Sequence, residues 1–414
     1  NSEKALPYRH QGIAGRITYN YDNRYFVEGN FGYNGSENFS PNHRFGFFPS
    51  IAVGYVVSNE KFFAPIRDVV SMVKLKASYG LVGNDQIGGD RRFIYNETVI
   101  GGGKYYFGTT PSQYTSVRLG EFPNPNVGWE KAKKLNLGAD LSFFNQLNIS
   151  VDYFKENREG IFLQRKSIPM YVGLSTKPWV NIGKMRNSGI DASLEYHQPL
   201  GKDLHLTVRG NFTYARNRIM DQDEPDYAYT YMNHSGQMQW QKFGLVAAGL
   251  FQDQEDIDSW AKQSFGEVKP GDIKYLDLNG DGIVDNYDTK PIGYSDIPEI
   301  VYGFGFSLQW KAFDLSAFFQ GVAHVSFSTL TDQTQAFVGR NLKESSVFAD
   351  LYGNTWTPEN PGAKYPRMTT GAIDNNNQLS TFWMANGRYL RLKNLELGYT
   401  LPKRIANKIA MQSL

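Results

Sequence analysis

The feature that most constrains the fold of this chain is an alternation of apolar and polar residues with a period of two. Residues 135–142 place an apolar side chain at every second position, a short polar turn follows, and residues 147–153 alternate again. Because successive side chains of a β-strand point to opposite faces of a sheet, such a pair predicts an antiparallel hairpin with one apolar and one polar face. The pattern returns in residues 190–214 and 304–320, so we expect hairpins to dominate the fold.

The apolar faces of these hairpins need a cover, and the composition indicates lipid. The chain has 28 Phe, 26 Tyr and 7 Trp, yet only 41% of its residues are hydrophobic. A barrel wall with one lipid face and one wet face needs about half of its strand positions to be polar. No apolar stretch is long enough for a spanning helix, which leaves a closed transmembrane β-barrel. The alternative is a soluble β-sandwich or propeller, in which aromatic residues at strand ends cap a core.

The connections between the predicted strands are of two kinds. Short turns alternate with long polar connections, which cover residues 83–130, 158–187, 215–298 and 323–386. Outer-membrane barrels place short turns on the periplasmic side and long loops outside. We therefore expect an all-β, antiparallel transmembrane barrel with long extracellular loops that form a vestibule.

Several function classes find no support in the sequence. The 43 basic and 41 acidic residues nearly balance, which gives no electrostatic signature of a nucleic-acid partner. The chain has no Cys, so disulfides and thiolate metal sites are excluded. The six His are scattered, and the chain has no zinc-protease, nucleophile-elbow or phosphate-loop motif. We therefore predict that the protein is not an enzyme.

The strongest local motif is a stretch of twelve residues, 277–288, with the ligand spacing of a calcium loop. Gly282 would supply the sharp turn, and Asp288 stands where the loop usually carries a bidentate Glu. The ligands would be the side chains of Asp277, Asn279, Asp281, Asp285 and Asp288 and the backbone carbonyl of Ile283. We expect a structural Ca²⁺ that stiffens an external loop. The alternative is a solvated acidic turn without an ion.

A second candidate site lies in the aromatic segment 226–240. Tyr229, Tyr231 and Trp240 offer flat apolar faces among hydrogen-bonding groups. Such a mixture suits a sugar or a peptide, so we predict that these residues contact substrate. The alternative is that the segment packs against the rim of the barrel.

Several ordered segments resemble the SusC/RagA-like branch of the TonB-dependent outer-membrane transporters of Bacteroidetes. They follow the order of the family through most of the chain. The segments are residues 46–54, 74–84, 181–190, 271–282, 292–304, 356–361, 365–367 and 389–402.

This resemblance implies a barrel of about 22 strands with an N-terminal plug, in the bacterial outer membrane. It also implies energy from TonB, through an N-terminal region, and a SusD-like surface lipoprotein as partner. The function expected is uptake of oligosaccharides or peptides. Residues 1–414 would then be a fragment of the barrel domain that lacks the plug and the final strands. The alternative function is a soluble or surface-anchored glycan-binding β-protein with a calcium-stabilised loop.

Overall fold

The computed structural model describes residues 7–88, 91–109, 112–174, 176–331, 347, 349–369 and 371–401. The chain divides into two compact units. The sheet unit comprises the described residues within 1–225, 302–320 and 391–414, and the loop unit those within 226–301 and 321–390. No helix among the described residues is long and apolar enough to cross a membrane.

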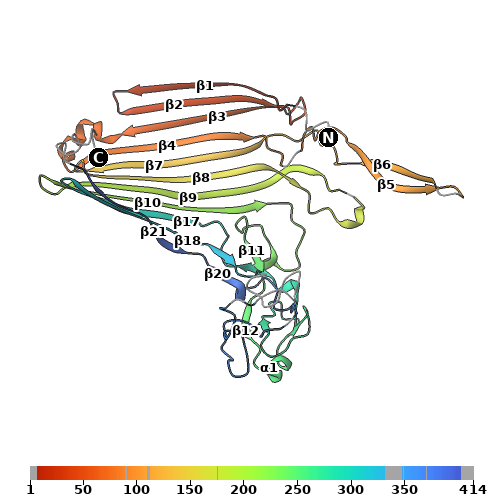
Figure 1. Ribbon diagram of the computed structural model, residues 1–414. Coiled ribbons are helices and arrows are strands. Elements are labelled where there is room, and N and C mark those ends of the chain that lie inside the picture. Colours follow the sequence, from red (N-terminus) through yellow and green to blue (C-terminus); the bar gives the residue numbers. More distant parts are fainter. Residues whose placement is uncertain are drawn as a thin grey trace. The chain divides into compact units, whose positions relative to one another are not determined.

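The sheet unit contains one sheet of 11 strands within the described part of the chain (Figure 1). In spatial order the strands are β1 (His10–Tyr21), β2 (Tyr25–Ser36), β3 (Phe45–Val56), β4 (Val70–Asn84), β7 (Glu130–Phe143), β8 (Leu147–Gln164), β9 (Trp179–Pro199), β10 (Leu204–Asp221), β17 (Ile300–Trp310), β18 (Phe313–Ala323) and β21 (Tyr389–Tyr399). The pairs from β1 to β10 are all antiparallel, which confirms the predicted hairpins in residues 135–153 and 190–214. Strands β17 and β18 of the third predicted hairpin are neighbours in the sheet.

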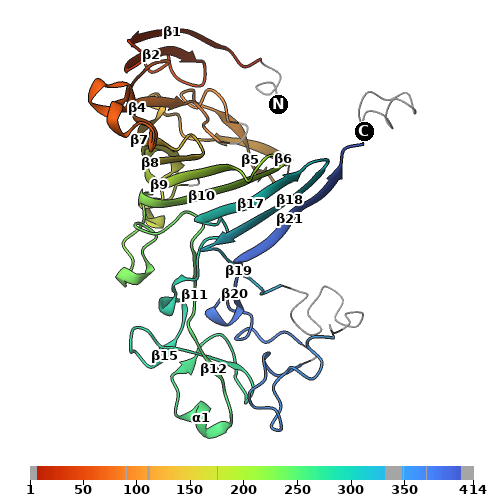
Figure 2. The ribbon, with the colours of Figure 1, turned by 90° about the vertical axis from the view of Figure 1, so that its left-hand side faces the viewer.

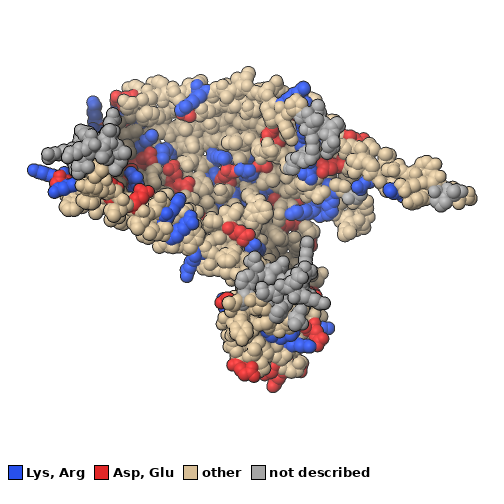
Figure 3. Space-filling model, in the orientation of Figure 1, with Lys and Arg blue, Asp and Glu red and all other residues tan. Residues whose placement is uncertain are grey.

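The register of these strands separates two faces. One row across eight strands is apolar throughout and joins Tyr19, Val27, Val53, Ala77, Leu137, Tyr153, Ile190 and Tyr214. Large apolar side chains on this face are exposed, for example Ile17 at 76% and Leu397 at 79%. The opposite face carries acidic and basic side chains that lie interspersed over the sheet (Figure 3). The alternation in the sequence therefore reflects an apolar face and a polar face.

Short and long connections lie at opposite ends of the strands. Residues 22–24, 144–146 and 200–203 are short turns at one end of the antiparallel set, and the four predicted long connections leave from the other end. Two connections depart from this rule, because residues 57–69 lie at the end of the short turns and the shorter stretch 37–44 lies at the other end. The predicted asymmetry is thus confirmed. The tight turn between β7 and β8 is centred on Phe144 and Asn145, which both have left-handed φ angles of 54° and 55°. Such a pair is typical of a type I′ turn, and it lies one residue before the turn that the sequence predicted.

All four predicted long connections contain more strand than expected. Strands β8 and β9 continue beyond residues 158 and 187 as far as the pair Gln164 and Trp179, so the predicted boundaries were wrong. A bulge at Gly160, whose φ is +70°, and charged residues on both strands break the alternation there. The first long connection also contains a hairpin of β5 (Val99–Phe107) and β6 (Ser112–Leu119).

The loop unit is built from short elements around an apolar core (Figure 2). Its two-stranded sheets pair β11 (Lys242–Gly244) with β16 (Lys290–Ile292), β12 (Ala247–Leu250) with β14 (Ile273–Tyr275), β13 (Lys262–Gln263) with β15 (Ile283–Val284), and β19 (Ser326–Ser328) with β20 (Met384–Asn386). Helix α1 (Gln254–Asp258) is a single short turn. The core contains the buried residues Leu245, Leu250, Ile273, Tyr275, Val284, Trp356 and Trp383.

Candidate functional site

The predicted calcium loop closes on its own backbone. Gly280 and Gly282 have left-handed φ angles of +77° and +86°, which a residue with a Cβ would adopt only with strain. Their N–H groups donate to the two carboxylate oxygens of Asp277, at 2.7 and 2.8 Å. The N–H of Ile283 donates to Asp281 in the same way, at 2.8 Å. The sequence therefore forms a tight turn that gathers side-chain oxygens.

The last residue of this loop, Asp288, is the most enclosed. Its side chain is fully buried, and its carboxylate accepts hydrogen bonds from the N–H groups of Leu278 at 2.6 Å and Asp285 at 2.8 Å. This holds the two ends of the loop together. Among the described residues no three or more His, Cys, Asp or Glu gather as a metal cluster. The predicted set also includes Asn279 and a backbone carbonyl, and such all-oxygen donors suit a hard cation.

Two of the predicted aromatic residues lie against this loop. The rings of Tyr229 and Tyr231 stack with centroids 5.4 Å apart, and Tyr229 meets the edge of Tyr287 at 6.1 Å. The hydroxyl of Tyr231 donates to the backbone carbonyl of Tyr287 at 2.7 Å. Burial, together with the nearby carboxylates of Asp288 and the rest of the loop, raises the pKa of Tyr231 above its ordinary value. The aromatic pair and the loop therefore form one local structure.

Trp240, the third predicted aromatic residue, does not join this pair. It is 63% exposed and has a left-handed φ of 66°. Within the described residues its ring makes no contact with Tyr229 or Tyr231. The structure thus brings together two of the three residues that the sequence singled out.

An ion pair of the loop unit with a fully buried carboxylate was not identified from the sequence. Asp272 is fully buried, and both of its oxygens accept hydrogen bonds from Arg367, at 2.8 and 3.0 Å. Asn376 donates to the same carboxylate at 2.9 Å. Burial also raises the pKa of the neighbouring Tyr275, whose hydroxyl donates to the carbonyl of Asn375.

Three of the family-like segments come into contact around this ion pair. Gly271 has a φ of +89°, and a Cβ at this position would collide with the ring of Trp356 and would lie 2.8 Å from Cβ of Arg367. The N–H of Arg367 donates to the carbonyl of Gly271 at 2.9 Å. Segments 271–282, 356–361 and 365–367 are therefore parts of one packed junction. Because these segments lie far apart in the sequence, their contact could not be predicted from it.

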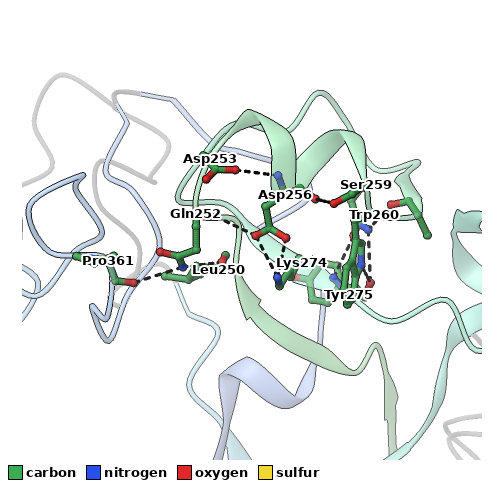
Figure 4. Close-up of polar contacts among 11 residues, drawn as sticks. Leu250, Gln252, Asp253, Asp256, Ser259, Trp260, Lys274, Tyr275 and Pro361 are labelled. Carbon is green, nitrogen blue, oxygen red and sulfur yellow. Dashed lines mark hydrogen bonds and ion pairs between the residues drawn. The ribbon is translucent and has the colours of Figure 1, made fainter.

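Helix α1 and the residues that follow it contact Lys274 and Tyr275 of β14 (Figure 4). Asp253 caps the helix by accepting from the N–H of Asp256 at 2.8 Å, and Asp256 pairs with Lys274 at 2.9 Å. Burial alone would raise the pKa of Asp256, but hydrogen bonds from Lys274 and from the N–H of Gln252 outweigh it and hold the pKa below its ordinary value. The indole N–H of Trp260 donates to the carbonyl of Tyr275 at 2.8 Å.

In the sheet unit, the polar face carries ion pairs that cross between strands. Lys76 on β4 reaches Asp140 on β7 at 2.9 Å and Asp152 on β8 at 3.2 Å. The longer reach passes over Gly138, whose place on β7 lies directly between Lys76 and Asp152 in the register. A Cβ at Gly138 would lie 2.7 Å from Cε of Lys76 and would collide with Asp152. This glycine therefore opens the path for the lysine.

Comparison with known proteins also indicates a β-barrel. The profile of the family described as "TonB dependent receptor-like, beta-barrel" matches residues 8–411. The chain is similar to TonB-dependent receptor P3 of Formosa agariphila, with 29% identity over 97% of this chain and 39% of the relative. It is also similar to the TonB-dependent receptor SusC of Bacteroides thetaiotaomicron, with 26% identity over 93% of this chain and 37% of the relative.

Among solved structures, the fold is similar to that of the RagAB peptide transporter. The TM-score is 0.74 at 22% identity, over 96% of this chain and 42% of the other chain. The chain thus spans about two fifths of the length of the curated relatives that it matches.

Proposed function

The chain belongs to the TonB-dependent receptor-like β-barrel family of the bacterial outer membrane, and on that premise we propose that it forms part of the wall of a nutrient importer. The parent protein would close its sheet into a barrel of about 22 strands around a plug. Its cargo would be an oligosaccharide or a peptide. Transport would draw on TonB, and a SusD-like surface lipoprotein would deliver the cargo.

The observation that carries this proposal is the two-faced sheet. An exposed apolar face suits lipid, and a polar face with paired charges suits a wet lumen. A soluble β-protein would cover its apolar face with a core instead.

The orientation of neighbouring residues on β17 tests this proposal. Phe306→Cys and Ser307→Cys would be introduced separately into the full-length protein and labelled in intact membranes with a water-soluble maleimide. We expect Ser307→Cys to react and Phe306→Cys to resist. Equal reaction of both would contradict the barrel and favour the soluble glycan-binding alternative.

We also propose that the loop of residues 277–288 binds Ca²⁺ as a structural ion. Its side chains at loop positions 1, 3 and 5, Asp277, Asn279 and Asp281, would bind the cation, together with the Ile283 carbonyl, Asp285 and Asp288. The glycine turn and the fully buried Asp288 support this proposal. The ion would stiffen the loop and supply no chemistry.

Terbium luminescence and calcium titration of the full-length protein test the ion. Asp281→Ala should weaken binding, whereas Glu267→Ala, an exposed carboxylate of the same unit, should not. If both variants bind like the unmodified protein, the loop is a solvated acidic turn.

For cargo, we propose that Tyr229 and Tyr231 act as a pair and that Trp240 contributes a separate exposed ring. Stacking of the two tyrosines and the exposure of Trp240 support this assignment. Leucine substitutions at each position, with cargo uptake by cells as readout, would test it. Unchanged uptake in all three variants would favour simple packing of the loop.

A further inference from the structure

Residues 57–69, which connect β3 to β4, form a folded segment at the short-turn end of the sheet. The segment contains two 3₁₀ helices, Val57–Asn59 and Lys61–Ile66. Phe63 is buried, whereas Phe62 is 69% exposed and Ile66 is 51% exposed. Figure 2 looks onto this end of the strands and shows the segment, in orange, on the outer side of the curved sheet. The segment therefore presents large apolar side chains outside the strands.

Glu60 connects this segment to the apolar face of the sheet. Tyr25 pairs with Tyr55 in the register, two positions along from a pair in the apolar row, so both tyrosines lie on that face. Their hydroxyls donate to one carboxylate oxygen of Glu60, at 2.6 and 3.3 Å. Arg24 donates to the other oxygen at 2.8 Å. The segment thus leans over the face that the proposed barrel turns to lipid, and not over the polar face.

The tyrosines also indicate the depth at which the segment lies. Tyr21, Tyr25 and Tyr55 lie at the ends of three neighbouring strands, with ring centroids 6.4 and 5.1 Å apart along the row. Tyrosine gathers at the membrane–water interface, where its ring meets apolar surroundings and its hydroxyl meets polar ones. Because two of these hydroxyls bind Glu60, the segment lies at the level of the interface.

The composition of the segment indicates which surface it meets. Two acidic and two basic residues cancel in charge, namely Glu60, Lys61, Arg67 and Asp68. A segment without net charge has no electrostatic preference for an anionic partner. Exposed aromatic and aliphatic side chains bind a membrane interface through the apolar area that they bury there. This combination suits the headgroups of zwitterionic phospholipids.

We propose that residues 57–69 are an interfacial anchor, which lies on the inner leaflet of the outer membrane and inserts Phe62 and Ile66 between zwitterionic phospholipids. The inference rests on the proposed barrel wall and adds a lipid contact outside its strands. Glu60 sets the depth of the anchor through the two tyrosine hydroxyls. The anchor holds the corner between β3 and β4 at a fixed height in the membrane.

The test places a spin label on the full-length protein in phosphatidylcholine bicelles, which contain no other protein and leave both membrane faces accessible. Electron paramagnetic resonance measures how often the label collides with oxygen, which dissolves in lipid, and with a water-soluble nickel chelate. Phe62→Cys carries the label on the anchor. Lys202→Cys is the matched control, since it is an exposed residue in a short turn at the same end of the sheet.

We expect the ratio of oxygen to nickel collisions to be about threefold higher at residue 62 than at residue 202, or more. Adding Glu60→Ala should lower the ratio at residue 62, because the tyrosines then no longer hold the segment. Equal ratios at the two labelled positions would overturn the anchor. A label at residue 62 that neither reagent reaches would be buried in protein, which would overturn it as well.

The labelling of β17 separates failure of the anchor from failure of the barrel. If Phe306→Cys resists the maleimide while the label at residue 62 is open to nickel, the wall stands and the anchor alone is wrong. If Phe306→Cys reacts like Ser307→Cys, the barrel is wrong, and the anchor that rests on it is wrong too.

Discussion

The two units of this chain place their apolar residues in opposite ways. In the sheet unit Ile17 and Leu397 are mostly exposed, whereas Ile273 and Tyr275 of the loop unit are fully buried. The sheet unit holds its strands by backbone pairing and leaves its apolar face exposed, which in the proposed barrel would meet lipid. The loop unit has a core like that of a water-soluble protein. One chain is therefore adapted to two solvents, and a substitution should act according to the unit in which it lies.

The largest effect should come from breaking the buried ion pair of the loop unit. Arg367→Met leaves the buried carboxylate of Asp272 without its cation, which costs about 3 kcal/mol or more. Hydrogen exchange should show faster opening in the loop unit and unchanged protection in the sheet. Lys364→Met, at an exposed ion pair of the same unit, is the control and should have little effect. If protection from hydrogen exchange fell equally in both units, the two units would not be independent.

A charge on the apolar face should be the next most costly change. Leu137→Arg puts a cation into lipid, at about 2–4 kcal/mol near the middle of the membrane. Asn136→Arg, one residue earlier on the polar face, should be tolerated. Folding into lipid vesicles, followed by the heat-dependent shift in gel mobility, measures both. Equal yields for the two variants would mean that the apolar face does not meet lipid.

Acid should act on the loop unit through Asp256. Because its pKa in the folded state lies below the ordinary value, the ion pair with Lys274 adds stability above about pH 4 and loses it as the pH falls through the lowered value. Asp256→Asn should therefore lower the melting temperature at pH 7, and the gap should close in stronger acid. If the difference in melting temperature stays constant down to pH 2, the effect of the substitution comes from packing and not from the ion pair. Asp258→Asn, on the same helix, serves as control.

The smallest effect should follow from Tyr231→Phe. This change removes one hydrogen bond to the Tyr287 carbonyl, worth about 1 kcal/mol, and keeps the stacked ring. Exchange of backbone amides in residues 277–288 should become faster, while the buried pair of Asp272 stays protected. Unchanged amide exchange would show that the aromatic pair does not stabilise the loop.

The sequence predicted the sheet well because residues of each strand point alternately to its apolar and its polar face. It failed where polar residues satisfy one another, as Arg158 does with Glu130 on the neighbouring strand and with Glu156 on its own strand. Such residues interrupt the pattern without ending the strand. Phe318 on β18 is the opposite case, an aromatic residue that interrupts the alternation of its strand. Cβ atoms at Gly303 and Gly305 of β17 would lie 2.7 and 2.8 Å from its ring, so these two glycines make room for it.

The candidate sites were predicted as separate pieces. Spacing alone placed Asp277 and Asp288 in one loop, and two residues of separation placed Tyr229 beside Tyr231. Nothing in the sequence relates those tyrosines to Tyr287, or Asp272 to Arg367, because these contacts join segments that are far apart along the chain. Contacts between distant segments leave no periodic pattern in the sequence, so only the structure could show them.

The passage of Lys76 over Gly138 has a consequence for the divergence of this sequence from its relatives. Positions 76, 138 and 152 lie on three adjacent strands, and the lysine can reach the aspartate only while the middle position lacks a side chain. Selection should therefore act on the three as a set. Homologues that have gained a larger residue at position 138 should also have lost the lysine or the aspartate, and this covariation would mark the register of the three strands in sequences without a structure.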